Sequence, residues 1–163
     1  MATIIIRIIT LAMSISIFFT SVIPARISGK DYEVVPENQI TVSDSGFRGE
    51  GVSLPEGYKI ISEYNDWIAL DFGDDKIKSS YDKKYFETNN LVVAAFLLPN
   101  PGYETHVINA AECGDTLLLN CVHIYDGSMV IQILDTNIVL VETGKEVKNA
   151  DISSQKMTVP IAF

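Results

Sequence analysis

The sequence has few of the residues on which most enzyme chemistry depends. Among 163 residues there are two cysteines, two histidines and one tryptophan. The chain contains no glycine-rich phosphate loop, no G-x-S-x-G nucleophile motif and no H-E-x-x-H zinc motif. These patterns would indicate a nucleotide enzyme, a serine hydrolase or a zinc peptidase. We therefore expect a protein that is not an enzyme and that has neither a cofactor nor a metal.

Positive charge is also scarce. Twelve lysines and arginines stand against 21 aspartates and glutamates, which gives a net charge of −9 at pH 7. A protein that binds nucleic acid or an anionic membrane surface needs clusters of basic residues, and this chain has none. We expect no nucleic-acid partner, and we expect any charged partner to be basic.

The first residues form an apolar segment of moderate length. Residues 1–19 carry one charge, on Arg7, and Ile8–Phe19 is interrupted only by single Thr and Ser residues. A membrane-spanning helix needs about twenty apolar residues, whereas the core of a secretory signal is shorter. We predict that residues 1–25 are a signal peptide or an uncleaved membrane anchor. The protein would then be secreted or attached to the cell surface, with no other membrane contact.

The rest of the chain divides into a lead-in and a β-rich domain. Residues 26–56 read as an extended lead-in with two short candidate strands, Tyr32–Val35 and Gln39–Val42, separated by the turn-forming Pro36. Pairing of this lead-in with the main sheet is left open by its sequence. Residues 57–163 are predicted to form the domain proper.

The clearest strand is an uninterrupted apolar run. Leu91–Leu98 consists of eight apolar residues without alternation, and it is bounded by Asn-Asn and Pro. Such a run is typical of a central strand that is covered on both faces. A short aromatic helix with Ser80 as its N-cap is predicted just before it.

Further strands follow at intervals of about ten residues. Tyr103–Ala111 and Thr116–Tyr125 are predicted to pair as an antiparallel hairpin, and strands follow at Met129–Leu134 and Ile138–Glu142 with a break at Asp135–Asn137. This spacing predicts an α+β fold. We expect a mainly antiparallel sheet, closed as a sandwich or an open barrel, with one or two short helices.

The cysteines and histidines all lie in or near this hairpin. If Cys113 and Gly114 form the turn, Cys121 is roughly 20 Å along the returning strand, too far for a disulfide, so we predict two free thiols. The same register places His106 opposite Cys121 and Glu104 opposite His123. These four groups could bind zinc, but a slip of one residue would separate them. We therefore predict no metal site and keep zinc as the minor alternative.

A proline-rich corner follows the apolar strand, at Pro99-Asn100-Pro101-Gly102-Tyr103. A rigid loop that ends in an aromatic residue offers a contact surface that loses little entropy on binding, and aromatic residues are favoured in protein interfaces. We predict that Pro99, Asn100, Pro101, Gly102 and Tyr103 form a partner-binding site. The alternative is a plain structural turn in which Tyr103 packs inward.

Three features together resemble a known family. They are Tyr85-Phe-Glu-Thr-Asn-Asn-Leu-Val-Val-Ala, the Pro-Gly-Tyr corner and the Gly-Asp hairpin turn. They are similar to the PrcB-type domain of exported bacterial proteins, named for an accessory subunit of a surface protease complex, over roughly Tyr58 to Glu142. The resemblance implies a non-enzymatic β-rich module that assists or stabilises an exported partner such as a protease.

The order Asn-Pro…Gly-Tyr at the corner is also similar to the Asn-Pro-Thr-Thr-Gly-Tyr loop of chagasin-like cysteine peptidase inhibitors. The two central threonines are missing here, and no companion Gly-rich or Arg-Pro-Trp loop is present. The second hypothesis is therefore a peptidase inhibitor that acts through the Pro99–Tyr103 loop.

Overall fold

The computed structural model describes residues 31–44, 57–70, 75–125 and 134–158. Almost all of them belong to one compact unit that runs from Glu33 to Phe163. The predicted signal or anchor at 1–25 lies outside the described residues, as does most of the strand predicted at 129–134. Among the helices of the described ranges, none is long and apolar enough to cross a membrane.

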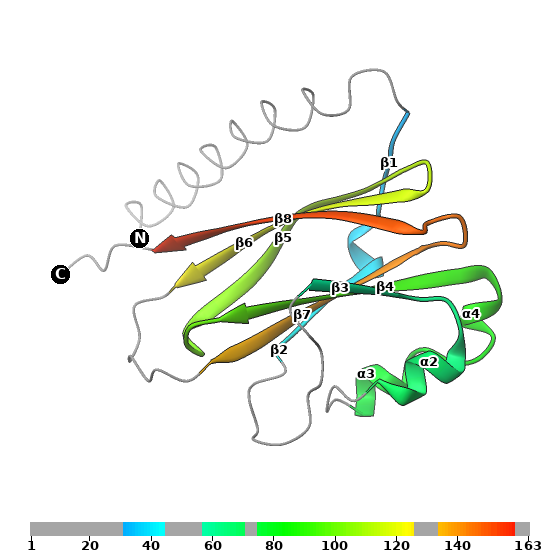
Figure 1. Cartoon of the computed structure of the whole chain (residues 1–163), viewed down its shortest axis with the longest axis horizontal. Helices are drawn as coiled ribbons and strands as arrows, with labels where there is room; N and C mark the ends of the chain where they lie inside the picture. Colours follow the sequence, from blue (N-terminus) through cyan, green and yellow to red (C-terminus); the bar gives the residue numbers. More distant parts are fainter. Residues whose placement is uncertain (1–30, 45–56, 71–74, 126–133, 159–163) are drawn as a thin grey trace, which may run out of the picture. The chain divides into compact units, whose positions relative to one another are not determined.

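The described residues form two four-stranded sheets (Figure 1). Sheet A has the order β1 (Glu33–Val34), β5 (Tyr103–Cys113), β6 (Thr116–Tyr125), β8 (Asn149–Thr158). Sheet B has the order β2 (Ile40–Asp44), β7 (Asp135–Gly144), β4 (Asn89–Leu98), β3 (Gly57–Ile61). The predicted fold class, an α+β fold dominated by β-sheet, is confirmed.

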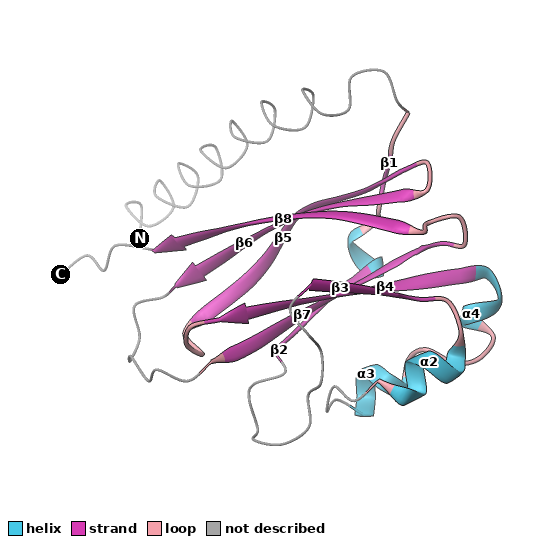
Figure 2. Ribbon diagram, in the orientation of Figure 1, coloured by secondary structure: helices cyan, strands magenta, loops and turns pink. Residues whose placement is uncertain are grey.

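Short helices accompany sheet B (Figure 2). They are the 3-10 helix η1 (Glu37–Gln39) and the α-helices α2 (Tyr64–Ala69), α3 (Asp75–Ser79) and α4 (Tyr85–Thr88). The aromatic side chains of α2, of α4 and of the segment before α4 pack on the outer face of sheet B. They form one buried cluster of Ile61, Trp67, Leu70, Tyr81, Phe86, Leu91, Val93, Ile138 and Leu140. Sheet B is therefore covered on both faces.

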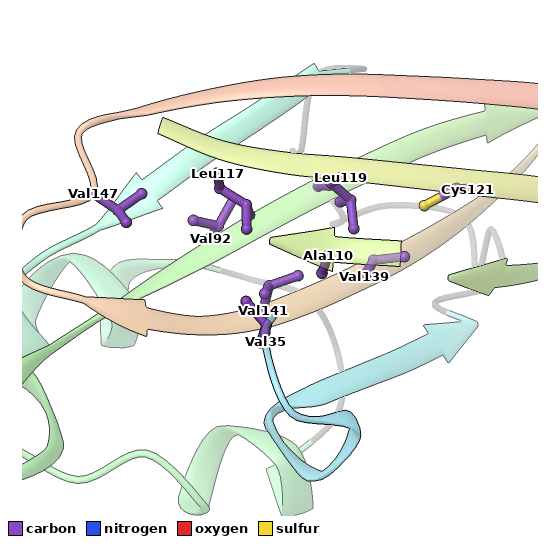
Figure 3. Close-up of a cluster of buried hydrophobic side chains, with 10 residues drawn as sticks. Val35, Val92, Ala110, Leu117, Leu119, Cys121, Val139, Val141 and Val147 are labelled. Carbon is purple, nitrogen blue, oxygen red and sulfur yellow. The ribbon is translucent and has the colours of Figure 1, made fainter. Parts of the chain in front are cut away.

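A second core lies between the two sheets. Its members come from both layers and are largely aliphatic, as Figure 3 shows: Val35, Val92, Ala94, Ala110, Leu117, Leu119, Cys121, Val139, Val141 and Val147. Along β4, Val92 and Ala94 enter this core whereas Leu91 and Val93 enter the helical cluster, because side chains alternate along a strand. The prediction that Leu91–Leu98 is a central strand covered on both faces is confirmed.

Sheet A contains one parallel pair, β6 with β8. After β6 the chain crosses to sheet B, runs along β7 and returns to sheet A. The chain reverses direction before and after β7, so β8 runs in the same direction as β6. The two strands can be neighbours in sheet A because β7, which separates them in sequence, lies in sheet B. Its first residues are fixed by the carbonyl of Asp115, which accepts hydrogen bonds from the N–H groups of Lys148 (2.8 Å) and Asn149 (3.0 Å).

The lead-in joins the fold through both sheets. β1 pairs with the end of β5, and β2 pairs with β7 from Ile40 to Asp44. Between them, Val35 is 5% exposed and belongs to the core between the sheets. The pairing that the sequence left open is therefore made, and residues 33–44 complete an edge of each sheet.

Two local predictions are wrong. Ser80 does not cap the aromatic helix: α4 begins at Tyr85, whose N–H donates to the Asp82 side chain at 2.8 Å, while the Ser80 hydroxyl donates to the carbonyl of Lys76. The predicted break at Asp135–Asn137 is instead the start of β7. Asn137 is accommodated in the strand because its Nδ2 donates to the Tyr103 carbonyl and to Oγ1 of Thr105.

Candidate functional site

The predicted corner connects β4 of sheet B to β5 of sheet A, at one end of the sandwich (Figure 1). Pro99 and Pro101 are exposed, whereas Asn100, Gly102 and Tyr103 are half-buried. All five residues lie together because they are consecutive. Both sheets support the corner, since one of its strands belongs to each.

The corner is closed by a side chain. The Gly102 N–H donates to Oδ1 of Asn100 at 3.0 Å, a local turn that Asn favours. Among the described glycines only Gly57 and Gly114 have a positive φ, so the corner does not use a left-handed conformation at Gly102. The Asn100 side chain, and the fixed φ of Pro99 and Pro101, therefore restrict this loop.

Tyr103 ties the corner to two other strands. Its ring packs against Tyr125 of β6, with the ring centroids 5.2 Å apart and the planes at 31°. Its backbone carbonyl accepts a hydrogen bond of 3.1 Å from Nδ2 of Asn137 in β7. The ring is half-buried, so it both supports the loop and presents part of its surface to solvent.

Apolar side chains continue from the corner along the end of sheet B. Leu97 is 40% exposed and Leu134 is 55% exposed. In the β4–β7 register Leu97 lies opposite Thr136 and Leu98 opposite Asp135. Leu134, next along the chain, is thus close to the start of the corner on the same end of the molecule. Leu97 and Leu134 therefore leave apolar surface exposed beside the proline loop.

Behind the corner lies a buried chain of hydrogen bonds. Nδ2 of Asn137 donates to Oγ1 of Thr105 at 2.9 Å, and that hydroxyl lies 2.9 Å from Nδ1 of His123. The Thr105 hydroxyl therefore bonds two side chains at once, Asn137 of β7 and His123 of β6. The imidazole packs on Phe96, with the centroids 4.8 Å apart.

The electrostatics of this region keep its titratable groups neutral. Burial lowers the pKa of His123 below its usual value, and the nearby Lys156 lowers it further. Burial raises the pKa of the Cys121 thiol to about 12. A thiol that stays protonated is a poor nucleophile. These hydrogen bonds join the start of β5 to β6 and β7.

The predicted hairpin register is wrong, and the zinc alternative fails with it. The turn consists of Gly114 and Asp115, so that Cys113 pairs with Thr116, and a bulge between Val107 and Asn109 shifts the register again. His123 pairs with Thr105 and Cys121 pairs with Val107. The even-numbered residues at 104 and 106 therefore point away from these two side chains.

Glu104 and His106 instead form an exposed pair on the outer face of sheet A, with Oε2 and Nε2 at 3.4 Å. Within the described ranges, no group of three or more His, Cys, Asp or Glu side chains is placed to hold a metal ion. Both cysteines are free and buried, as predicted.

Sequence reasoning found the corner but missed the residues that hold it. Tyr125 could have been placed opposite Tyr103 by a correct hairpin register. Asn137 was missed because Asp135–Asn137 was interpreted as a break between strands. Leu97 and Leu134 carried no signal beyond being apolar.

Comparison with known protein families, curated proteins and solved structures found no match for this chain. The resemblance to the PrcB-type domain stays a prediction from the residues.

Proposed function

We propose that this chain is a non-enzymatic accessory domain that binds another protein through the corner surface, defined as Pro99, Asn100, Pro101, Gly102 and Tyr103. The observation that supports it best is that the loop is held in one conformation while its two prolines stay exposed. A loop with this combination is restrained before any partner arrives.

The energetic advantage follows from that restraint. Fixing the backbone of one flexible residue costs about 1–2 kcal/mol. The corner has already met most of this cost during folding, through the Asn100 turn and the Asn137 hydrogen bond to Tyr103. The binding free energy gained from contacts with a partner is therefore not reduced by the entropy cost of ordering the loop.

The chemistry of the surface suggests the kind of partner. The exposed faces of Leu97, Leu134, Pro99 and Pro101 favour an apolar contact area, and Tyr103 supplies an aromatic contact. The net charge of −9 favours a basic partner. With the predicted signal or anchor and the resemblance to PrcB-type domains, this supports a secreted or cell-surface protein such as an exported protease.

The direct test is site-specific photo-crosslinking of the full chain in its native envelope. A photo-reactive amino acid is placed at Pro101 and, as a control, at Glu146, an exposed residue between β7 and β8 at the opposite end of the sandwich. The proposal predicts one defined protein adduct at position 101 and none at position 146. The same adducts at both positions, or none at either, would refute it.

The inhibitor hypothesis requires a different experiment. If the corner acts as a chagasin-like loop, the full chain slows a papain-like peptidase at micromolar concentration and Gly102→Glu abolishes the effect. Inhibition that depends on Gly102 would replace the accessory function by this one. Absence of inhibition would remove the alternative.

A further inference from the structure

Sheet A has an open edge that begins at the corner. β1 pairs with β5 only at its far end, where Glu33 lies opposite Glu112 and Val34 opposite Ala111. The last hydrogen bond between them joins the Val35 N–H to the Ala110 carbonyl at 2.9 Å. In the part of the chain that the structure describes, residues 103–109 of β5 have no strand on that side.

A groove of about 350 Å³ runs beside this edge. Its lining comes from η1, β2 and β5 and consists of Glu37, Ile40, Val42, Thr105, His106 and Val107. β2 is itself the edge strand of sheet B, so the groove lies between two sheet edges. Its floor includes Val42, which is 43% exposed although it pairs with a fully buried residue of β7.

The two sides of the open edge differ in chemistry. Toward the groove lie the aliphatic side chains of Ile40, Val42 and Val107. Toward the outer face of sheet A lies Glu104, whose side chain is 76% exposed. An added strand would place alternate side chains on these two sides. The side chains that face the groove would meet these aliphatic groups beside Glu37 and Thr105, and those on the outer face would meet the Glu104–His106 pair.

Charge complementarity distinguishes the kinds of strand that can pair with this edge. A second copy of this chain carries the same net charge of −9 and the same Glu37 and Glu104, so edge-to-edge pairing would bring like charges together. A basic segment would instead pair Lys or Arg with these carboxylates. One carboxylate on each side of the edge, Glu37 at the groove and Glu104 on the outer face, therefore favours a basic strand from another protein.

We propose that the β5 edge accepts an extended segment of the partner protein, with alternating apolar and Lys or Arg residues, as an additional strand of sheet A. This inference rests on the proposed function, because Tyr103 both ends the corner surface and begins the edge. The bulge between Val107 and Asn109 ends the regular part of the edge, so the added strand pairs with Tyr103–Val107.

The experiment measures backbone hydrogen exchange by NMR on the full chain with three synthetic peptides. One alternates Val with Lys and Arg, one alternates Val with Glu and Asp, and one is the basic peptide N-methylated at alternate residues so that it cannot pair along the edge. We expect the basic peptide alone to slow exchange within Tyr103–Val107. Equal protection by the acidic or the N-methylated peptide would overturn the inference, as would no protection at all.

Charge reversal provides the matched comparison. Glu104→Lys and Glu37→Lys change exposed residues beside the groove and should each weaken binding of the basic peptide by about tenfold. Glu87→Lys makes the same change on α4, at the far end of β4 from the corner, and should have a smaller effect. Equal weakening by all three variants would show that only net charge matters and would contradict the inference.

Two results separate this inference from the proposed function. An adduct at Pro101 without peptide protection of β5 overturns the added strand and leaves the corner function in place. Peptide protection without an adduct at Pro101 overturns the corner function. A dimer that protects Tyr103–Val107 in the absence of peptide would assign the edge to a second copy and refute the inference.

Discussion

At the scale of single residues, Asn90 joins three parts of the fold. Its side chain is 3% exposed, and Nδ2 donates to the carbonyls of Lys145 (3.3 Å) and Val147 (2.9 Å) in the turn between β7 and β8. Its own carbonyl accepts from the hydroxyls of Tyr85 (3.0 Å) and Thr143 (3.3 Å). The backbone carbonyl of Asn90 thus bonds the helical layer and β7, and its side-chain amide bonds the turn that leads back to sheet A.

The Asn90→Ala variant should lose about 2 kcal/mol of unfolding free energy, because two buried carbonyls lose their donor. The measurement is urea denaturation followed by circular dichroism. Asn89→Ala is the control: that side chain is half-exposed, and its bonds to Tyr85 and Thr88 stay within the same turn. Equal losses in the two variants would contradict the role assigned to Asn90.

His123 makes the stability of the sandwich depend on pH. Its folded-state pKa lies below the ordinary value of 6.5, because of burial and then Lys156. Between the two pKa values the unfolded chain binds more protons than the folded one, so stability is retained above about pH 6.5 and falls as the pH drops below it. In the protonated imidazole Nδ1 is a donor, so the Thr105 hydroxyl has to accept hydrogen bonds from both His123 and Asn137.

The His123→Gln variant should therefore show a shallower loss of unfolding free energy between about pH 6.5 and pH 5 than the unchanged protein. The measurement is the urea midpoint at a series of pH values. His106→Gln, on the exposed outer face of sheet A, serves as the control variant. If the unfolding free energy of His123→Gln depends on pH as steeply as that of the unchanged protein, other groups cause the pH dependence.

At the scale of elements, the β5–β6 hairpin depends on one backbone conformation. Gly114 has φ of +64°, and a Cβ at this position would meet no heavy atom within 4 Å. The free-energy cost of a larger residue there therefore comes from the backbone conformation and not from a clash with neighbouring atoms. The turn lies at the opposite end of the hairpin from the corner surface.

Replacing Gly114 by Ala should reduce the unfolding free energy by about 1–2 kcal/mol, since a left-handed conformation is unfavourable for most L-residues. Gly114→Asn should cost less, because Asn adopts this conformation more readily. Thermal or urea denaturation of the pair gives the comparison. If Ala and Asn cost the same, strain at φ is not the determining factor.

Elements differed in how far their sequence predicted them. β4 was predictable because burial on both faces removes alternation and leaves an apolar run. β8 was not, because most of its side chains are exposed at the edge of sheet A and its pattern resembles a polar tail. The hairpin was predicted but its register was not. The turn lies one residue later than predicted, at Gly114 and Asp115, and a bulge between Val107 and Asn109, which has no sequence signature here, shifts the register once more.

The same distinction applies to the candidate site. The corner was found because prolines and glycine are local signals. The groups that hold it, Tyr125 and Asn137, come from strands distant in sequence, and their proximity depends on registers that the sequence alone did not determine.

At the scale of the whole molecule, the lead-in is part of the β-rich unit. Val35 is buried in the core between the sheets, and β2 covers the edge of β7. A fragment of residues 57–163 would leave both edges uncovered. We expect it to unfold without cooperativity, whereas residues 31–163 should unfold in a single transition by urea denaturation. Equal cooperativity in the two fragments would show that the lead-in is dispensable.

The central claim is that the restrained corner surface binds a protein. Its most direct test is the affinity of the partner recovered by crosslinking at position 101, measured by calorimetry for the full chain and for a variant with Pro99 and Pro101 both replaced by glycine. Glu146→Ala is the control at the opposite end. The account predicts about tenfold weaker binding for the glycine variant, with unchanged affinity for the control. Equal affinity of all three proteins, with the glycine variant still folded, would contradict it.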